Sequence, residues 1–433
     1  MFSRNAGLFV VLWVLACPAT SRSADVTNVI DAFDGSKTFD GIFSIRFAHE
    51  QRRSLIVREW ICDKNDNPGA TGKNPFCPES SQVLDARQMR FTEVMNVLNL
   101  DLRAGLYKDL EFYATIPVVL GWESRLEHDT GVASGNSTVD SELSPSLFSL
   151  PYRSANRVGL GDVTLGLKFA PLHADRDPHY PSWVVGFEYL APLGKKRTAG
   201  DSGVGGAVHA ITLYTAISRR LASWVEPYFK THGIIRVRNG EPFDYALTTQ
   251  TLKQPGDSLG ITMGAEFYPW NQPSETGQYV SVDLALSAEF TFEGREFTEL
   301  FDALGDSDCD PLGDCNLTLY THYAAKGEFV TSDGVTDVEQ YGRLGVSLGA
   351  TYQPMSNLRV RLGFSYFHVT SHYLTFADAG KDLDGQGDVQ AFNSLGQNEY
   401  NPKYNENIDD FGKRFRLDDS HIYRFILSVE GQL

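Results

Sequence analysis

The sequence predicts an all-β fold, a closed antiparallel transmembrane β-barrel of about 12 strands. The first observation is strict alternation of apolar and polar residues over 94–122. Leu98, Leu100 and Leu102 share one parity there, while Asp101 and Arg103 share the other. Two such runs with a short break between them predict a β-hairpin with one apolar face.

The second observation is the length of the connections, which alternate along the chain. Short breaks at 107–109, 173–180, 219–223, 271–277 and 355–357 alternate with longer connections at 61–88, 123–158, 194–207, 238–257, 296–339 and 373–420. Short periplasmic turns and long extracellular loops with an even strand number are typical of bacterial outer-membrane barrels. A soluble β-sandwich or lipocalin-like barrel would point the same apolar face inward, and periodicity alone does not exclude that inversion. The regular alternation of connector lengths argues against it.

Tryptophan placement gives a third observation. Trp60, Trp122, Trp183, Trp224 and Trp270 all fall at ends of predicted strands, as the aromatic girdles of membrane barrels do. By parity Trp122 belongs to the lipid face, whereas Trp224 and Trp270 fall on the inward parity of their strands.

The beginning of the chain has the features of an export signal. Arg4 precedes the apolar run 6–16, which is too short to cross a bilayer and suits the hydrophobic region of a signal peptide. We therefore expect residues 1–24 to be a signal peptide, 25–41 a periplasmic lead-in or plug segment, and 42–433 the barrel. Two kinds of cleavage remain open: Val14–Cys17 approximates a lipoprotein box, and small residues at 19–24 suit ordinary signal peptidase cleavage, which we favour.

Charge and cysteine content narrow the function further. The 433 residues carry a formal net charge of -17 and no basic patch, so nucleic-acid binding has little support. Each of two polar loops contains a local cysteine pair, Cys62 with Cys77 and Cys309 with Cys315. We expect two disulfides, because export leads to an oxidising compartment.

The inward parity supplies the candidate functional residues. It predicts a lumen lined by charged side chains of both signs: Asp101, Arg103, Glu111, Asp162, Lys168, Glu188, Glu226, Lys230, Glu266, Asp283, Arg343, Arg359, Arg361 and Arg424. They could pair across strands into a lattice or line a watery, mildly selective path. A barrel of this size lies between filled eight-stranded and open sixteen-stranded barrels, so a narrow pore is the middle expectation. Pro117 predicts a bulge or kink, because proline removes one ladder hydrogen bond.

Metal binding and catalysis find less support. The aspartates Asp306, Asp308, Asp310 and Asp314 and the stretch 382–388 suggest loop calcium, but no EF-hand spacing is present, and a solvated acidic loop is favoured. We predict no cofactor. A lipid-modifying enzyme needs a serine or histidine with an orienting partner near the membrane surface, and the nearest candidates are Ser371, His372, Ser420 and His421. They match no known enzyme motif.

Three stretches resemble a family of outer-membrane transporters named after the meta-pathway of phenol degradation. They are GLYKDLEFYATIPVV at 105–119, GLGDVTLGLKF at 159–169, and GFEYLAPLG at 186–194 followed by GVGG at 203–206. The chain departs from the family pattern with Leu193 and Val204 where threonine is common. The resemblance implies export to the outer membrane, passage of small aromatic or other apolar solutes, and no catalytic residues. Gly159, Gly161, Asp162 and Pro117 carry over as structural positions.

The sequence thus favours an outer-membrane channel for passive uptake of small solutes, in contact with membrane lipid and lipopolysaccharide. One alternative is a surface-binding or structural barrel whose long loops engage partners. A lipid-modifying enzyme is the third reading. The sequence leaves open the solute, the oligomeric state, and whether loops or residues 25–41 occlude the pore.

Overall fold

Twelve long strands form the wall of a closed antiparallel barrel in the computed structural model, which describes residues 24–30, 41–62, 82–140, 146–174, 176–177, 179–239, 252, 254–272, 278–307, 318–319, 330–390 and 393–432. In chain order they are β1 (Gly41–Cys62), β2 (Gln82–Tyr107), β3 (Leu110–His128), β6 (Val163–Leu172), β7 (Ser182–Ala191), β8 (Val208–Ser218), β9 (Val225–Arg238), β10 (Ser258–Gln272), β11 (Gln278–Thr291), β16 (Tyr341–Met355), β17 (Leu358–Val369) and β19 (Phe415–Gln432). Each pairs with its sequence neighbour in this series, and β19 returns to β1 to close the wall. The predicted fold class is confirmed.

Short elements lie between the wall strands. They are β4 (Tyr152–Arg153), β5 (Arg157–Leu160), β12 (Gly294–Glu296), α1 (Phe301–Gly305), β13 (Thr318–Leu319), β14 (Val330–Thr331), β15 (Thr336–Val338) and β18 (His372–Tyr373). Within the described ranges no helix is long and apolar enough to cross a membrane.

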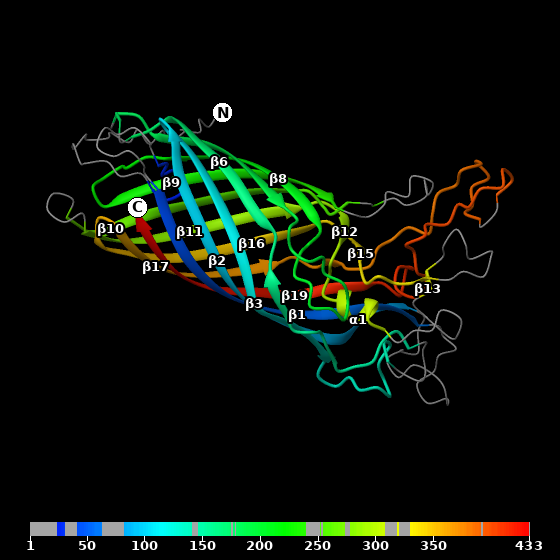
Figure 1. The fold of residues 1–433 in the computed structure, drawn as a ribbon. Coiled ribbons are helices and arrows are strands. Elements are labelled where there is room, and N and C mark those ends of the chain that lie inside the picture. The colour runs from blue at the N-terminus through cyan, green and yellow to red at the C-terminus, as the bar shows by residue number, and fades with distance from the viewer. Residues whose placement is uncertain are drawn as a thin grey trace, which may run out of the picture.

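The two rims of the barrel differ, as the connector lengths predict (Figure 1). The short connections β2–β3, β6–β7, β8–β9, β10–β11 and β16–β17 and the C-terminal end of β19 lie at one rim, called here the turn end. The longer connections, together with α1, β12 and β15, lie at the other, called the loop end.

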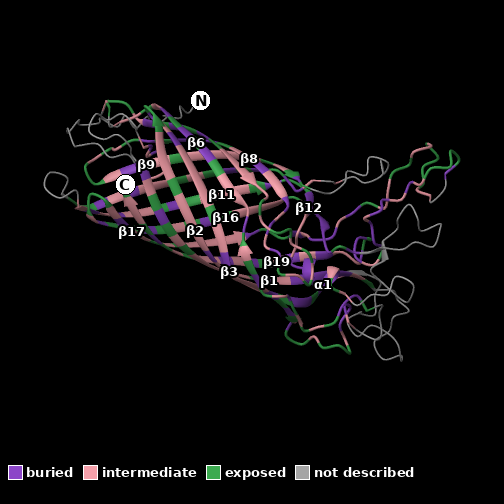
Figure 2. Ribbon diagram, in the orientation of Figure 1, coloured by how far each residue is buried: buried purple, intermediate pink, exposed green. Residues whose placement is uncertain are grey.

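The apolar parity points outward. Leu284 and Leu286 are 46% and 54% exposed, while Ala285 between them is 7% exposed. Figure 2 shows the same change of exposure from residue to residue along the strands. A soluble protein does not expose a continuous apolar band around its whole wall, so this band indicates a barrel that stands in lipid. The inverted, soluble alternative is therefore excluded.

Strands β1 and β2 exceed what a bilayer requires. They have 22 and 26 residues, against the roughly 9–11 of a transmembrane strand. Their extensions continue past the wall at the loop end, and the pairing register of β1 shifts between Arg53 and Leu55 and between Ile56 and Val57. Apolar residues of these extensions are buried in a cluster that includes Ile56, Met89 and Phe415. The cluster gives the loop end a hydrophobic core of its own.

Three tryptophans do not face as their parity predicts, and for Trp122 and Trp270 the cause is a bulge. The β2–β3 register shifts between Asn96 and Val97, so Trp122 leaves the lipid parity; its indole N–H donates to Glu93 at 2.8 Å, and Arg197 lies over its ring. The prediction of a lipid-facing Trp122 is therefore wrong. A shift after Phe267 turns Trp270 outward, where it is 36% exposed, and Trp224 stacks on Phe267 at 56% exposure. Alternation in a sequence cannot register a bulge, because the extra residue is invisible until the strands are paired.

Pro117 interrupts the wall on one side only. Asn99 of β2 pairs regularly with Pro117, and the nearest register shift on that side lies further along, between Asn96 and Val97. On the other side, pairing of β3 with β6 ends at Thr115, and pairing with β5 begins again at Val118. The Gly161 N–H donates to the Pro117 carbonyl at 2.9 Å across the gap. The predicted strand 159–171 is consequently split into β5 and β6.

Candidate functional site

In the half of the lumen nearer the turn end, aromatic rings of the wall lie over glycines. Tyr214 of β8 is the cross-strand partner of Gly186 in β7, and a Cβ at Gly186 would overlap the tyrosine ring. Two further pairs repeat this arrangement: Tyr113 with Gly166, and Tyr228 with Gly264. Only a residue without a side chain lets a ring rest against the backbone in this way. The rings therefore extend along the wall instead of across the lumen.

The hydroxyl groups of Tyr113 and Tyr228 bind carboxylates on the wall, and that of Tyr214 lies beside the Tyr113 hydroxyl. Tyr113 donates to Glu188 at 2.7 Å, and its oxygen lies 3.3 Å from that of Tyr214. Tyr228 donates to Asp283 at 2.8 Å, and the Lys230 ammonium lies 4.5 Å from the centre of the Tyr214 ring. Three of the predicted charged residues, Glu188, Lys230 and Asp283, thus contact tyrosines on the wall. The aromatic surface adds an apolar character that charge patterning did not predict.

Residues 24–30, the N-terminal segment, lie inside the barrel at the turn end. Thr27 is fully buried and its hydroxyl lies 2.6 Å from that of Ser218. Val29 packs against Ala170, Val184 and Ala216 of the wall. The expectation of a lead-in or plug segment at 25–41 therefore has a described part, 25–30, within the lumen, whereas 31–40 lies outside the described residues.

Charged wall residues bind the N-terminal segment. The Asp25 carboxylate accepts hydrogen bonds from Arg359 at 3.2 Å and Arg361 at 2.6 Å. The Asn28 carbonyl accepts from Arg103 at 3.3 Å and from Lys168 at 2.6 Å. These four cations belong to the predicted lumen set, and they converge on one short segment.

Acidic wall residues bind the backbone of the same segment. Glu226 accepts from the N–H of Ala24 at 2.8 Å, Glu266 from Asp25 at 3.3 Å, and Glu111 from Ile30 at 2.8 Å. Glu111 also pairs with Arg103 at 2.7 Å. Half of the predicted lumen residues thus hold the N-terminal segment in place: Arg103, Glu111, Lys168, Glu226, Glu266, Arg359 and Arg361.

Three of the other seven predicted lumen residues, Asp101, Arg343 and Arg424, pair with an opposite charge on a neighbouring strand. Asp101 accepts from Arg46 at 3.1 Å, Arg343 donates to Glu289 at 3.0 Å, and Arg424 donates to Glu50 at 2.7 Å. Such pairing matches the lattice reading more closely than an unpaired charged path. Asp162 differs, because its carboxylate accepts the N–H groups of Gly194 and Gly206 at 3.0 and 2.8 Å and so fixes the β7–β8 connection.

A loop that contains α1 occupies the barrel interior at the loop end. Asp302 in α1 forms an ion pair with Arg157, which is 1% exposed, and also accepts a hydrogen bond from Ser124 of β3 at 3.4 Å. The neighbouring Glu299 pairs with Arg52 of β1. Leu300 and Leu304 are fully buried in the loop-end core. Contacts with β1, β3 and β5 thus anchor this loop on one side of the wall, where β1, β2, β3 and β5 are successive neighbours.

The four catalytic candidates do not form a nucleophile–base pair in the described contacts. The Ser371 hydroxyl donates to Asp418, and the Ser420 hydroxyl lies 2.8 Å from that of Ser54. His372 hydrogen-bonds the Thr370 carbonyl, while His421 contacts Tyr366 and Asp419. Nucleophilic catalysis requires a base within reach of the serine, and here each candidate has another partner.

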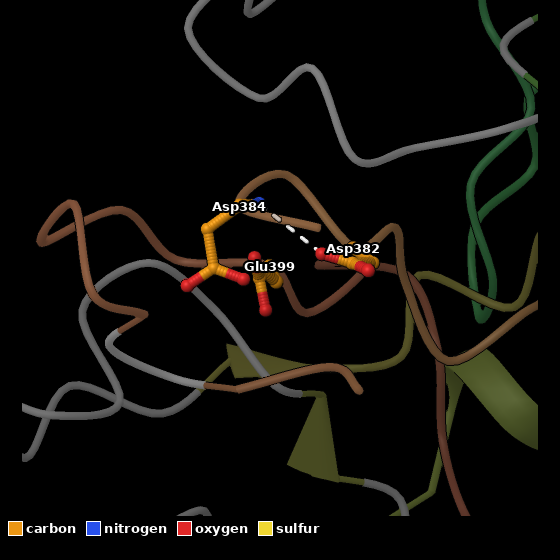
Figure 3. A group of neighbouring side chains, drawn as sticks. All are labelled: Asp382, Asp384 and Glu399. Atoms are coloured by element: carbon orange, nitrogen blue, oxygen red, sulfur yellow. Dashed lines mark hydrogen bonds between the residues drawn. The ribbon is translucent and has the colours of Figure 1, made fainter. Parts of the chain in front are cut away.

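The loop aspartates divide into two groups. Asp382, Asp384 and Glu399 bring carboxylate oxygens within 4.8 Å of one another. Figure 3 shows these three side chains. A hydrogen bond from Ser394 lowers the pKa of Asp384, and one from Asn393 lowers that of Glu399. The carboxyl groups of Asp384 and Glu399 are therefore ionised at neutral pH, and ionised oxygens are the ligands that a hard cation such as calcium prefers. Exposed acidic groups also often gather without a bound cation. Asp306 accepts from Tyr152 at 3.0 Å instead, and Asp308, Asp310 and Asp314 lie outside the described residues.

The structure does not test the two predicted disulfides. Cys62 ends β1, whereas Cys77, Cys309 and Cys315 lie outside the described residues. Both pairs remain predictions.

Comparisons with known proteins return distant structural likenesses. No family model and no curated protein matches the chain. An outer-membrane channel from Pseudomonas putida F1 aligns over 93% of this chain and 100% of its own, with 12% identity and a TM-score of 0.43. A FadL homologue of Pseudomonas aeruginosa covers 90% of each chain at 9% identity, TM-score 0.35, and a mutant of the TodX monoaromatic hydrocarbon channel covers 91% of this chain and 90% of its own at 9% identity, TM-score 0.32. Likenesses this distant assign no function, and the fold rests on the strand pairing itself.

Proposed function

We propose that this chain is an outer-membrane channel for passive uptake of small apolar solutes, aromatic ones in particular. The observation that carries the proposal is the aromatic wall of the lumen, where the rings of Tyr113, Tyr214 and Tyr228 rest on glycines. Ring faces provide the flat, polarisable contact that aromatic solutes favour, while the hydroxyl groups are already engaged with carboxylates. A lumen filled only by salt bridges between wall residues would not require glycines opposite tyrosines.

The proposal includes an orientation and a closed state. In bacterial barrels the short turns face the periplasm, so the N-terminal segment closes the periplasmic side and the α1 loop the extracellular side. Passage then requires that one or both of these segments move. The charged residues of the lumen set act mainly as anchors for the closing segments and as cross-strand braces.

The exposed apolar band supports placement in the outer membrane, with lipid and lipopolysaccharide around the wall. A signal peptide at the N-terminus, disulfides in the loops and the resemblance to the meta-pathway transporters are in keeping with this location. None of them is needed for the argument from the aromatic wall.

The test is solute entry into vesicles whose outer leaflet is lipopolysaccharide, which slows unaided entry of apolar compounds. We expect vesicles that contain the purified protein to take up benzyl alcohol faster than protein-free vesicles, and glucose at an unchanged rate. Equal rates for benzyl alcohol with and without protein would remove the channel and favour a surface-binding or structural barrel. Faster entry of both solutes would indicate a general pore instead of an aromatic one.

A further inference from the structure

The nitrogen of Ala24 lies at a buried carboxylate. It is 2.8 Å from Oε1 of Glu226, and both residues are 1% exposed. Glu226 stands near the start of β9, where Ser218 donates to Oε1 at 2.6 Å and Arg220 lies 3.4 Å from Oε2. A buried carboxylate needs such cationic and hydrogen-bonding partners to offset its desolvation.

The sequence before Ala24 has the pattern that signal peptidase requires. Ser21 and Ser23 are small residues at the third and first positions before Ala24, and they follow the apolar run 6–16. Cleavage one bond later would place Arg22 at the third position, where a small residue is needed. The bond between Ser23 and Ala24 is therefore the better site, one residue earlier than the boundary drawn from the sequence alone.

We propose that the chain is cleaved between Ser23 and Ala24, and that the α-amino group freed on Ala24 forms a buried ion pair with Glu226. Hydrolysis adds water across the peptide bond, so that Ser23 leaves with a carboxylate and Ala24 keeps an amine. An α-amino group has a pKa of roughly 7.7–8.0, so it is mostly protonated at neutral pH. Processing thus converts a neutral N–H donor at Glu226 into a cation.

This conversion strengthens the buried contact between Ala24 and Glu226. A hydrogen bond between an ammonium and a carboxylate is about twice as strong as a neutral one, and low local polarity raises its value further. Two adjacent residues then form ion pairs of opposite polarity. The ammonium of Ala24 binds Glu226, and the carboxylate of Asp25 binds Arg359 and Arg361. Reversed charges on adjacent residues fix both the depth and the register of the N-terminal segment.

The inference does not depend on what passes through the barrel. It concerns where the mature chain begins and what its first charge binds. A structural barrel with no transport activity would carry the same ion pair.

The first test is the N-terminal sequence and intact mass of protein purified from outer membranes. We expect Ala24-Asp25-Val26-Thr27 as the first four residues. A chain that begins at Asp25, or at a lipidated Cys17, would overturn the proposal whatever its activity.

The second test is the labelling rate of the α-amino group with an amine-reactive reagent in the folded protein. Pairing that raises the pKa of the amine by about one unit lowers its reactive neutral fraction about tenfold. We expect slow labelling of Ala24 in the wild type, labelling about tenfold faster in Glu226→Gln, and no change in Glu50→Gln, whose carboxylate binds Arg424 elsewhere in the barrel. Labelling of the wild type as fast as that of Glu226→Gln would overturn the ion pair. Each variant is compared only as folded barrel, and the wild-type N-terminal sequence tests the cleavage site even if Glu226→Gln does not fold.

Discussion

The ring of Tyr214 lies over Gly186 on the lumen side of the β7–β8 pair. Replacing Gly186 by valine would place a branched side chain where the ring now rests. We expect the ring to swing into the lumen and benzyl alcohol uptake into lipopolysaccharide-coated vesicles to fall severalfold. Overpacking of this kind costs about 1–3 kcal/mol, which a barrel of this size tolerates.

Gly135→Val is the matched control for that variant. Gly135 lies in a connection at the loop end, and a Cβ there would meet nothing within 4 Å. Its uptake should equal that of the wild type. If Gly186→Val transports as well as the control, the tyrosine wall is not the passage.

Loss of the Asp25 charge should loosen the N-terminal segment. Asp25→Asn leaves Arg359 and Arg361 without the anion that they share, so the segment is held by fewer contacts. We expect a higher conductance in planar bilayers and more frequent openings than in the wild type. Asp177→Asn, in an exposed turn where the carboxylate contacts His179, should leave conductance unchanged. Identical traces for the two variants would mean that the segment does not close the turn end.

Removal of Arg157 should release the α1 loop. Breaking a buried pair leaves an uncompensated charge and costs about 3–5 kcal/mol, so Arg157→Ala strands Asp302 in the loop-end interior. We expect faster hydrogen exchange at 298–305 and little change in the central wall strands. The double variant with Asp302→Ala should recover part of the loss, because no charge is then left unpaired. A double variant no better than the single one would argue against the pair as the anchor.

Asp409 should make the packing of the loop 374–414 depend on pH. Burial raises the pKa of this carboxyl from its ordinary value of 3.8 to about 7, although it accepts N–H groups from Asn405 and Ala377. A raised pKa favours the neutral acid in the folded loop, so the stabilisation is complete below about 3.8 and is lost as pH rises through about 7. After correction for intrinsic rates, hydrogen exchange around Asn405 should be slower at about pH 5 than at about pH 8. Asp409→Asn should show no such difference; a wild type equally protected at both values would contradict the prediction.

Alternation and connector length were enough to predict the barrel, its two rims and the facing of most wall residues. Leu102, Ile116 and Leu120 are exposed on the outer wall, as their parity requires. Between bulges, the face on which a strand residue lies depends only on the local alternation, which can be read from the sequence.

Contacts that depend on register could not be predicted. Tyr214 and Gly186 are far apart along the chain, and they meet only because the β7–β8 pairing places them opposite each other. The predicted facing of Trp122 was wrong for a related reason, because one bulge reverses the parity of the residues beyond it. Alternation singled out the charged residues of the inward parity, but the N-terminal segment that half of them contact has no periodic pattern that would reveal its position.

The most direct test of the aromatic-channel account is the ratio of benzyl alcohol to glucose entry in lipopolysaccharide-coated vesicles, measured for the wild type and for Gly186→Val. The account predicts a ratio well above that of protein-free vesicles for the wild type and a severalfold lower ratio for the variant. A wild-type ratio equal to that of empty vesicles would contradict it.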